Sequence, residues 1–193
     1  MAGICELSRM WSAGTRSVIS YPIGDSGQEL ILTDTILDHL KRYRQRTPGS
    51  REAGGQLFAR FEDARVSIER ATGPNPSDQR TLFTFSPNRL VERREIKRLF
   101  EVGLHYVGDW HTHPEAHPCP SDTDIHSFQE MFQQSRHKLA SFVMIIVGNA
   151  GFPDGLFVAL CDGGGIKPLT LGQVSSNTKG RRSASSRDNH RNQ

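Results

Sequence analysis

Hydrophobic residues follow two different periods along this chain, and together they predict strands alternating with helices. Short apolar or alternating runs bounded by Gly, Pro or Asp predict strands, whereas apolar positions three and four residues apart predict helices. The predicted strands cover residues 28–33, 55–61, 64–72, 105–111, 142–148, 156–161 and 166–171. The predicted helices cover residues 35–46, 88–100 and 123–136.

The order of these elements predicts one domain with an α/β fold. The strands at 55–61 and 64–72 are separated by only two residues, so they are expected to form a hairpin. Strands and helices mixed in this order predict a curved mixed sheet, largely antiparallel and flanked by helices. A chain of 193 residues is long enough to bury the core of such a domain.

The two ends of the chain lack the pattern of a packed domain. Residues 1–27 show no sustained periodicity and carry several Gly and Ser, which predicts a loosely ordered lead-in. After Gly172 the composition turns to Ser, Asn, Arg and Lys, which cannot bury enough apolar surface to build a core. We therefore expect a domain at residues 28–172 and a disordered basic tail at residues 173–193.

The net charge of +3 is concentrated at the C-terminal end of the chain. From residue 175 onward five Lys and Arg oppose one Asp, so this segment carries +4 and the rest of the chain −1. A nearly neutral folded part gives no support for a general nucleic-acid-binding role. We expect no nucleic-acid partner.

Cysteine usage and hydropathy predict a cytoplasmic protein. Cys5, Cys119 and Cys161 are an odd number without a CxxC pair, which argues against a disulfide framework. Glu6 and Arg9 interrupt any apolar leader segment. No apolar run approaches the ~18–20 residues of a membrane span, so no membrane partner is expected.

Candidate chemistry is concentrated between residues 108 and 124. If the predicted strand continues through His113, then His111 and His113 point to the same face, about 6.5–7 Å apart along the backbone. Ser121-Asp-Thr-Asp124 has the form of a helix N-terminus, with Ser121 as N-cap and Asp124 in the first turn. The Asp124 carboxylate can then face the two imidazoles.

This set of side chains predicts a catalytic zinc site. Two His and one carboxylate can bind zinc at ~2.0–2.2 Å and leave the fourth position to water, as catalytic sites do. The pKa of such a water falls to ~7, so hydroxide becomes available near neutral pH. A hydrolase also needs a proton acceptor, and several carboxylates of the chain could serve.

The pattern resembles that of the JAB/JAMM (MPN-type) metallopeptidases: His-x-His, seven residues, Ser, two residues, Asp. Family members also carry an upstream Glu at the start of a glycine-rich strand, which Glu52-Ala-Gly-Gly-Gln-Leu-Phe matches. The resemblance implies a cytidine-deaminase-like fold and one Zn²⁺ per chain, held by His111, His113 and Asp124. It also implies that Glu52 shuttles the proton of the zinc water and that Ser121 stabilises the oxyanion.

The sequences Trp-His-Thr-His-Pro-Glu and Pro-Ser-x-Thr-Asp are similar to those of small bacterial JAB proteins. Those proteins are encoded beside E1- and E2-like conjugating enzymes, including operons of cyclic-oligonucleotide (CBASS-type) antiphage defence. This implies a zinc isopeptidase that cuts the C-terminus of a ubiquitin-like protein or conjugated enzyme from its target. Two alternatives are a processing peptidase for a ubiquitin-like or sulfur-carrier precursor, and a non-catalytic MPN scaffold. The full set of ligands argues against the scaffold.

Several of these residues also have purely structural interpretations. Ser121 could be only a helix cap, and Glu52 a solvated loop carboxylate. Asp109 either orients a ligand histidine or forms a surface salt bridge. His117 and Cys119 are interpreted as loop residues near the opening of the site, because the four zinc positions are already filled.

The aromatic pair Phe83 and Phe85 precedes Pro87 in a segment without a clear period. Such residues could form a substrate groove. Packing in the core is the interpretation that we favour from the sequence, because large aromatic side chains usually lie in protein interiors.

Overall fold

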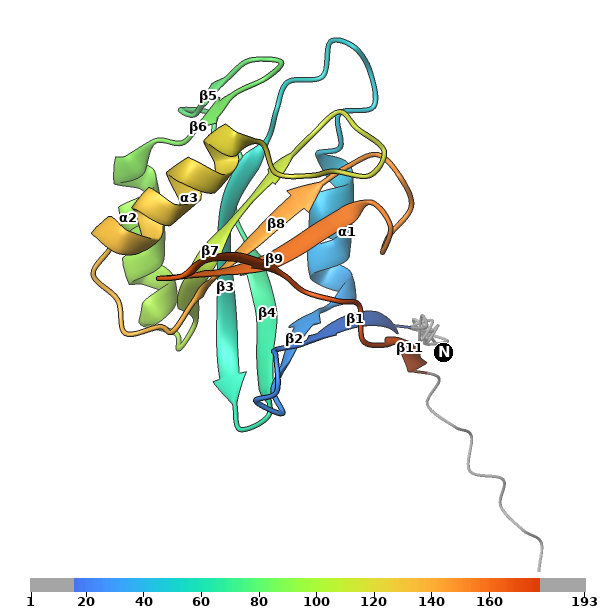
Figure 1. The fold of residues 1–193 in the computed structure, drawn as a ribbon. Helices are drawn as coiled ribbons and strands as arrows, with labels where there is room; N and C mark the ends of the chain where they lie inside the picture. Colours follow the sequence, from blue (N-terminus) through green and yellow to red (C-terminus); the bar gives the residue numbers. More distant parts are fainter. Residues whose placement is uncertain (1–15, 178–193) are drawn as a thin grey trace, which may run out of the picture.

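A single sheet of nine strands forms the framework of residues 16–177, the part of the chain that the computed structural model describes (Figure 1). Its strands are β1 (Arg16–Pro22), β2 (Glu29–Leu32), β3 (Gly54–Glu62), β4 (Arg65–Ala71), β7 (His105–Thr112), β8 (Phe142–Val147), β9 (Leu156–Asp162), β10 (Gly165–Pro168) and β11 (Val174–Asn177). The strand order is β10-β9-β8-β7-β3-β4-β2-β1-β11. Only the pairs β2–β4 and β7–β8 are parallel. The predicted α/β fold, with a curved and largely antiparallel mixed sheet, is confirmed.

Helices cover both faces of this sheet. They are α1 (Asp34–Arg42), α2 (Arg89–Phe100) and α3 (Asp122–Gln134). Odd-numbered residues of β8 share a core cluster with α1, whereas even-numbered residues share a second cluster with Phe128 of α3. Because successive strand residues point to opposite faces, α1 and α3 lie on opposite sides of the sheet. None of the helices within residues 16–177 combines the length and the hydropathy that crossing a bilayer requires.

Strand β8 explains why the centre of the sheet is well determined by the sequence. All six of its residues, Phe142–Val147, are buried, because both faces of the strand are covered. A continuous apolar run is what a strand covered on both faces needs. The parallel partner β7 is thereby fixed in register against β8, and the candidate histidines lie at its C-terminal end.

The predicted domain boundaries are wrong at both ends of the described chain. Strand β1 lies inside the predicted lead-in, and β11 lies inside the predicted tail. They pair with each other, and β1 also pairs with β2, which buries Ile19 and Tyr21. Two apolar residues at alternate positions suffice here because the neighbouring strands supply the rest of the burial. The remainder of the two predicted segments, residues 1–15 and 178–193, lies outside the described residues.

Gly108 allows β7 to approach β8 closely at a bulge in its pairing with β3. Its φ is +145°, and a Cβ added there would overlap the carbonyl oxygen of Val143. We therefore expect Gly108→Ala to lower the free energy of unfolding by more than ~3 kcal/mol in urea titrations. Gly151→Ala is the matched control, because a Cβ there meets nothing within 4 Å. Equal stability of the two variants would contradict the close approach.

Candidate active site

His111 and His113 lie at the C-terminal end of β7 and point to the same side of the sheet. The backbone ladder continues past the strand, since the His113 N–H donates to the Val147 carbonyl at 2.9 Å. On the other side of β7, His111 is paired with Gly54 of β3. The backbone that carries the two imidazoles is thus held by neighbouring strands. Strand β7 itself ends at Thr112, and one further hydrogen bond to β8 extends the pairing to His113.

Asp124 is placed by the N-terminus of α3. The Ser121 N–H donates to Asp124 Oδ2 at 2.7 Å, and the Ser121 hydroxyl donates to the same oxygen at 2.6 Å. In return, Ser121 Oγ accepts the Asp124 N–H at 3.2 Å, which completes a capping box. Ser121 is therefore a helix cap, as predicted, and it also orients the carboxylate toward the histidines.

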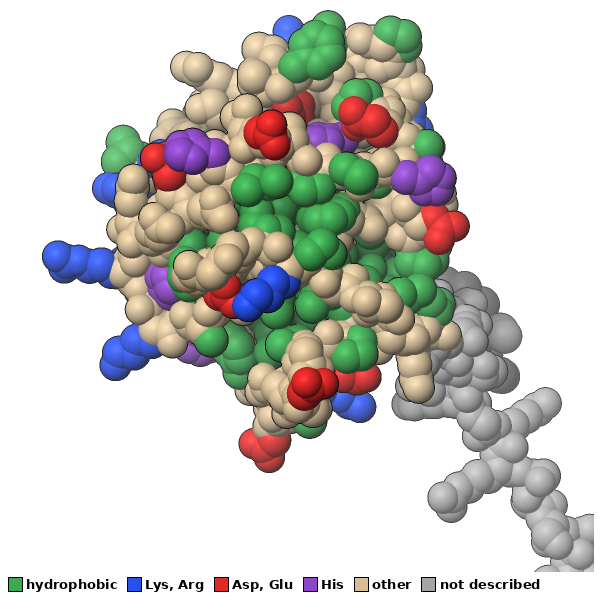
Figure 2. Space-filling model, viewed as in Figure 1, with side chains coloured by type: hydrophobic (Ala, Val, Ile, Leu, Met, Phe, Trp, Pro, Cys, Tyr) green, Lys and Arg blue, Asp and Glu red, His purple; other side chains and the backbone are tan. Residues whose placement is uncertain are grey.

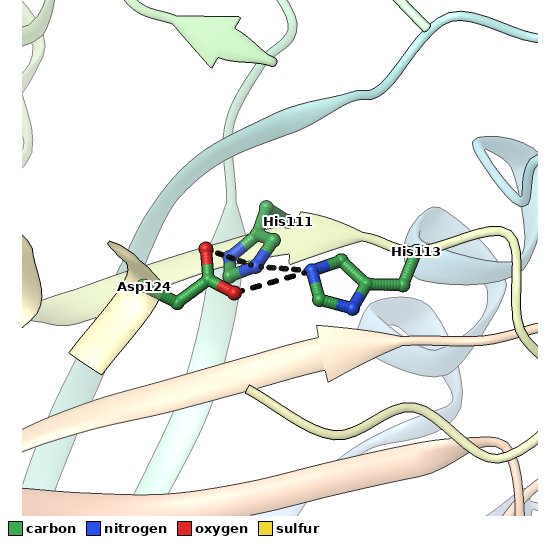
Figure 3. Close-up of side chains that lie close together, drawn as sticks. All are labelled: His111, His113 and Asp124. Atoms are coloured by element: carbon green, nitrogen blue, oxygen red, sulfur yellow. Dashed lines mark hydrogen bonds and ion pairs between the residues drawn. The ribbon is translucent and has the colours of Figure 1, made fainter. Parts of the chain in front are cut away.

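The three side chains converge on one point (Figure 3). The two Nε2 atoms of His111 and His113 are 3.2 Å apart. Asp124 Oδ1 lies 3.3 Å from His111 Nε2, and Oδ2 lies 3.4 Å from His113 Nε2. Within residues 16–177, no other group of three or more His, Cys, Asp or Glu side chains brings its donor atoms this close.

These distances fit a single metal ion. A tetrahedral ion with bonds of ~2.0–2.1 Å separates its donor atoms by about 3.3–3.4 Å. The Nε2–Nε2 distance is close to this value, and so is the distance from each Nε2 to one oxygen of Asp124, which is Oδ1 for His111 and Oδ2 for His113. Metal binding also needs both Nε2 atoms free of protons. Glu115 Oε2 lies 3.5 Å from His113 Nδ1 and favours the tautomer with its proton on Nδ1, which leaves Nε2 free.

The electrostatics of the site favour a cation between these groups. Burial alone would raise the pKa of the Asp124 carboxyl, but hydrogen bonds and charge from the two histidines and Ser121 hold it well below its ordinary value. Burial lowers the pKa of His113, and the hydrogen bond and charge of Asp124, with Glu115 and Glu52, outweigh this and raise it. A metal ion can take the place of the proton that this arrangement attracts.

Glu52 lies just before β3 and lines the same cavity as the three candidate ligands. Its N–H donates to the Thr81 carbonyl at 2.8 Å, and its own carbonyl accepts from Arg80 Nε at 2.6 Å. Burial raises the pKa of the Glu52 carboxyl above its ordinary value, although the two histidines partly oppose the shift. It is therefore a half-buried carboxylate at the site and not a solvated loop residue.

The cavity has a volume of about 580 Å³ and extends beyond the candidate ligands. Its walls include Phe128 and Met131 of α3 and Arg89 and Glu92 of α2, so the two helices flank it. In Figure 2 acidic and histidine side chains gather in a band across the upper part of the face, where Figure 1 places the loop from β7 to α3.

A two-stranded hairpin, which the sequence did not predict, forms another wall of the cavity. It consists of β5 (Gln79–Arg80) and β6 (Phe85–Ser86). Phe83, in its turn, is 80% exposed, and both Phe83 and Phe85 line the cavity. The favoured prediction of core packing is therefore wrong for Phe83, whereas Phe85 is half-buried and its ring lies against Gly54 of β3. The groove interpretation is the one that the structure supports.

Other residues singled out by the sequence have different places. Asp109 accepts a hydrogen bond from the Tyr106 hydroxyl at 3.0 Å, and among residues 16–177 it has no bond to a ligand histidine and no salt bridge. Burial, with the charge of Glu92, raises its pKa to about 7. His117 Nδ1 lies 3.2 Å from the Asp154 carbonyl and Cys119 is exposed, but neither residue lines the cavity.

Two residues at the site carried no signal in the sequence. Thr112 lies between the two histidines, and its side chain is fully buried on the opposite face of β7. Its hydroxyl donates to Oε1 of the buried Gln45 at 3.1 Å. A single Gln in a loop 67 residues away could not be linked to this strand by any local pattern.

The sequence has known relatives. A family model described as prokaryotic homologs of the JAB domain matches residues 32–158. A CD-NTase/cGAS isopeptidase of Pseudomonas aeruginosa is 27% identical over 151 residues, which cover 76% of this chain and 91% of the relative. One of Escherichia coli is 28% identical over 109 residues, 55% of this chain and 70% of the relative. A probable metalloprotease of Sinorhizobium fredii is 34% identical over 101 residues, 50% of this chain and 62% of the relative.

Proposed function

Because this chain belongs to the family of prokaryotic JAB-domain homologues and is a metallopeptidase, we propose that it is an isopeptidase that reverses protein conjugation. The reaction is hydrolysis of the amide bond between the C-terminus of a ubiquitin-like protein, or of a conjugated enzyme, and an amine of its target. Relatives that carry the name CD-NTase/cGAS isopeptidase support this, one of them over most of its own length. The conjugate is made by E1- and E2-like enzymes in a CBASS-type antiphage system.

The observation that carries the proposal is the convergence of three metal-binding donors beside a half-buried carboxylate in one cavity. We propose Zn²⁺ as the ion, held by His111, His113 and Asp124, because two imidazoles and a carboxylate that converge are a donor set that suits it. When bound, the ion supplies Lewis-acid activation of a water molecule and of the scissile carbonyl.

Glu52 moves the proton in this proposal. Its carboxylate accepts a proton from the attacking water as the new C–O bond forms. It then delivers that proton to the leaving nitrogen as the C–N bond breaks, so that the products are an amine and a carboxylic acid, which releases its proton to solvent and becomes a carboxylate. Its raised pKa suits both steps, because the group must accept and release a proton near neutral pH.

Ser121 stabilises the negative oxygen of the tetrahedral intermediate in this proposal. Its hydroxyl proton points at Asp124 Oδ2 in the free protein, 2.6 Å away. It can turn toward a substrate oxygen without releasing Asp124, because the Ser121 N–H still donates to the same carboxylate oxygen. The capping and the catalytic interpretations of Ser121 are therefore compatible.

Specificity for a conjugate gives a direct test. We expect release of the intact target from the conjugate made by the E1- and E2-like enzymes, and abolition of that release by a zinc chelator. Unfolded casein should be cleaved at least ~100-fold more slowly, because it has no folded partner that can dock beside the cavity and contribute binding energy to the reaction. Gel densitometry of both substrates measures the two rates.

A linear precursor of the same ubiquitin-like protein is the matched substrate for the alternative function. Faster cleavage of that precursor than of the conjugate would favour a processing peptidase. Chelator-sensitive digestion of casein, with the conjugate left whole, would contradict the deconjugating role and leave the metallopeptidase unaffected.

A further inference from the structure

A buried amide behind the candidate site connects three separate segments of the chain. Gln45 follows α1 and is 5% exposed. Its Nε2 donates to the carbonyls of Leu82 at 3.0 Å and Ser50 at 3.3 Å. Its Oε1 accepts from the Thr112 hydroxyl at 3.1 Å. The side chain thus joins the turn of the β5–β6 hairpin, the segment before Glu52 and the strand that carries the histidines.

The surrounding groups determine which way this amide faces. The Thr112 hydroxyl accepts the Ala53 N–H at 3.0 Å, so its own proton is available for Gln45 Oε1. A reversed amide would point its oxygen at the two carbonyls of Ser50 and Leu82, which have no proton to donate. The network is therefore satisfied in one orientation only, and each bond supports the next.

Two bonds of this network bracket Glu52. The Ser50 carbonyl, two residues before Glu52, is held by Gln45 directly. The Ala53 N–H, one residue after it, is held by Thr112, which Gln45 orients. Within residues 16–177 the Glu52 carboxylate has no hydrogen bond or ion pair of its own, so its position depends on the backbone that carries it.

The hairpin strengthens the same connection. Thr81 accepts the Glu52 N–H, and Gln45 holds the carbonyl of the next residue, Leu82. At the other side of the site, Asn149 Nδ2 donates to the carbonyls of Gln45 at 2.8 Å and Pro114 at 2.9 Å. Hydrogen bonds therefore connect Gln45 to Thr112, which precedes His113, and through Asn149 to Pro114, which follows it.

We infer that Gln45 is a positioning residue that sets the Glu52 carboxylate against the metal-ligand strand through Thr112 and Ser50. The inference rests on the proposed function, because it assumes that Glu52 transfers the proton. A misplacement of ~1 Å can cost as much as ~100-fold in rate. Loss of the Gln45 amide should therefore lower kcat through Glu52, with metal content unchanged.

A double-mutant cycle with Glu52 separates this role from a merely structural one. Gln45→Met removes the amide at nearly constant volume. We expect it to lower kcat for the conjugate at least ~10-fold in the wild-type background, and by less than ~2-fold in a Glu52→Gln background. KM and metal per chain should stay within ~2-fold of their values in the parent protein. Equal losses of kcat in both backgrounds would overturn the inference, because Gln45 would then act independently of Glu52.

Three further variants complete the design. Thr112→Val removes the hydroxyl that bonds Gln45 and should lower kcat in the same way, with a large loss in the wild-type background and a small one in the Glu52→Gln background. This variant replaces Gln45→Met in the test if Gln45→Met does not fold. Thr112→Ser keeps the hydroxyl and should therefore retain most of the kcat that Thr112→Val loses. Gln56→Met is the matched control, because Gln56 is a buried Gln of β3, 3% exposed, whose side chain bonds none of these segments.

The cycle also distinguishes failure of the inference from failure of the proposed function. A wild-type rate in Glu52→Gln alone would overturn the proton-transfer role and with it the positioning role of Gln45. A large loss in Glu52→Gln, together with equal effects of Gln45→Met in both backgrounds, would overturn the positioning role only.

Discussion

Replacing His111 or His113 by Ala, or Asp124 by Asn, is expected to leave less than ~0.1 equivalent of zinc per chain and to lower activity by more than ~10³-fold. The two Nε2 atoms lie 3.2 Å apart, and each lies 3.3–3.4 Å from one oxygen of Asp124. Within residues 16–177 no fourth His, Cys, Asp or Glu belongs to this group, so a lost ligand has no substitute there. Two remaining ligands bind zinc too weakly to retain it through dialysis. Elemental analysis and cleavage of the conjugate measure the two effects.

The choice of Asn at position 124 protects the fold during this test. Its amide oxygen can still accept the Ser121 N–H, so that the start of α3 keeps its cap. His117→Ala is the control, because His117 lies in the loop between the ligands but does not line the cavity. It should bind one equivalent of zinc and cleave normally. Stoichiometric zinc in all three ligand variants would contradict the assignment of the site.

The parts of the site that local sequence patterns determine could be predicted. His111 and His113 share a face because strand residues alternate, and Asp124 faces them because Ser121 caps the helix in which it lies. Each of these relations spans at most three residues. The distance from His113 to Asp124 spans a proline-rich loop, and there the family resemblance supplied what periodicity could not.

The parts that depend on contacts between distant segments could not be predicted. Gln45 and Thr112 are 67 residues apart, and Gln45 and Leu82 are 37 apart. Strand β1 is stabilised by β11, which follows it by more than 150 residues, so neither carries a long apolar run of its own. The exposed Phe83 looked like a core residue because composition alone does not reveal a hairpin beside a cavity.

Glu52→Gln is expected to keep one zinc per chain and the stability of the parent protein while losing at least ~10²-fold in kcat. Gln has nearly the size and shape of Glu, so the backbone bonds to Thr81 and Arg80 remain. A neutral amide cannot accept the proton of the attacking water, and general acid–base catalysis of this kind contributes ~10²–10⁴-fold. Parallel measurements of zinc content, thermal unfolding and cleavage of the conjugate separate chemistry from folding.

Glu115→Gln makes the same chemical change at a second carboxylate near the site. Its Oε2 lies 3.5 Å from His113 Nδ1, but its side chain is 59% exposed, so the charge is screened by water. We expect a loss of less than ~5-fold, from a weaker preference for the tautomer that leaves His113 Nε2 free. An inactive Glu115→Gln together with a normal rate in Glu52→Gln would contradict this assignment, because Glu115 in the exposed loop would then be the carboxylate that transfers the proton. Because Glu52 is half-buried at the cavity wall and Glu115 is largely exposed, the geometry favours Glu52 as the group that carries the proton.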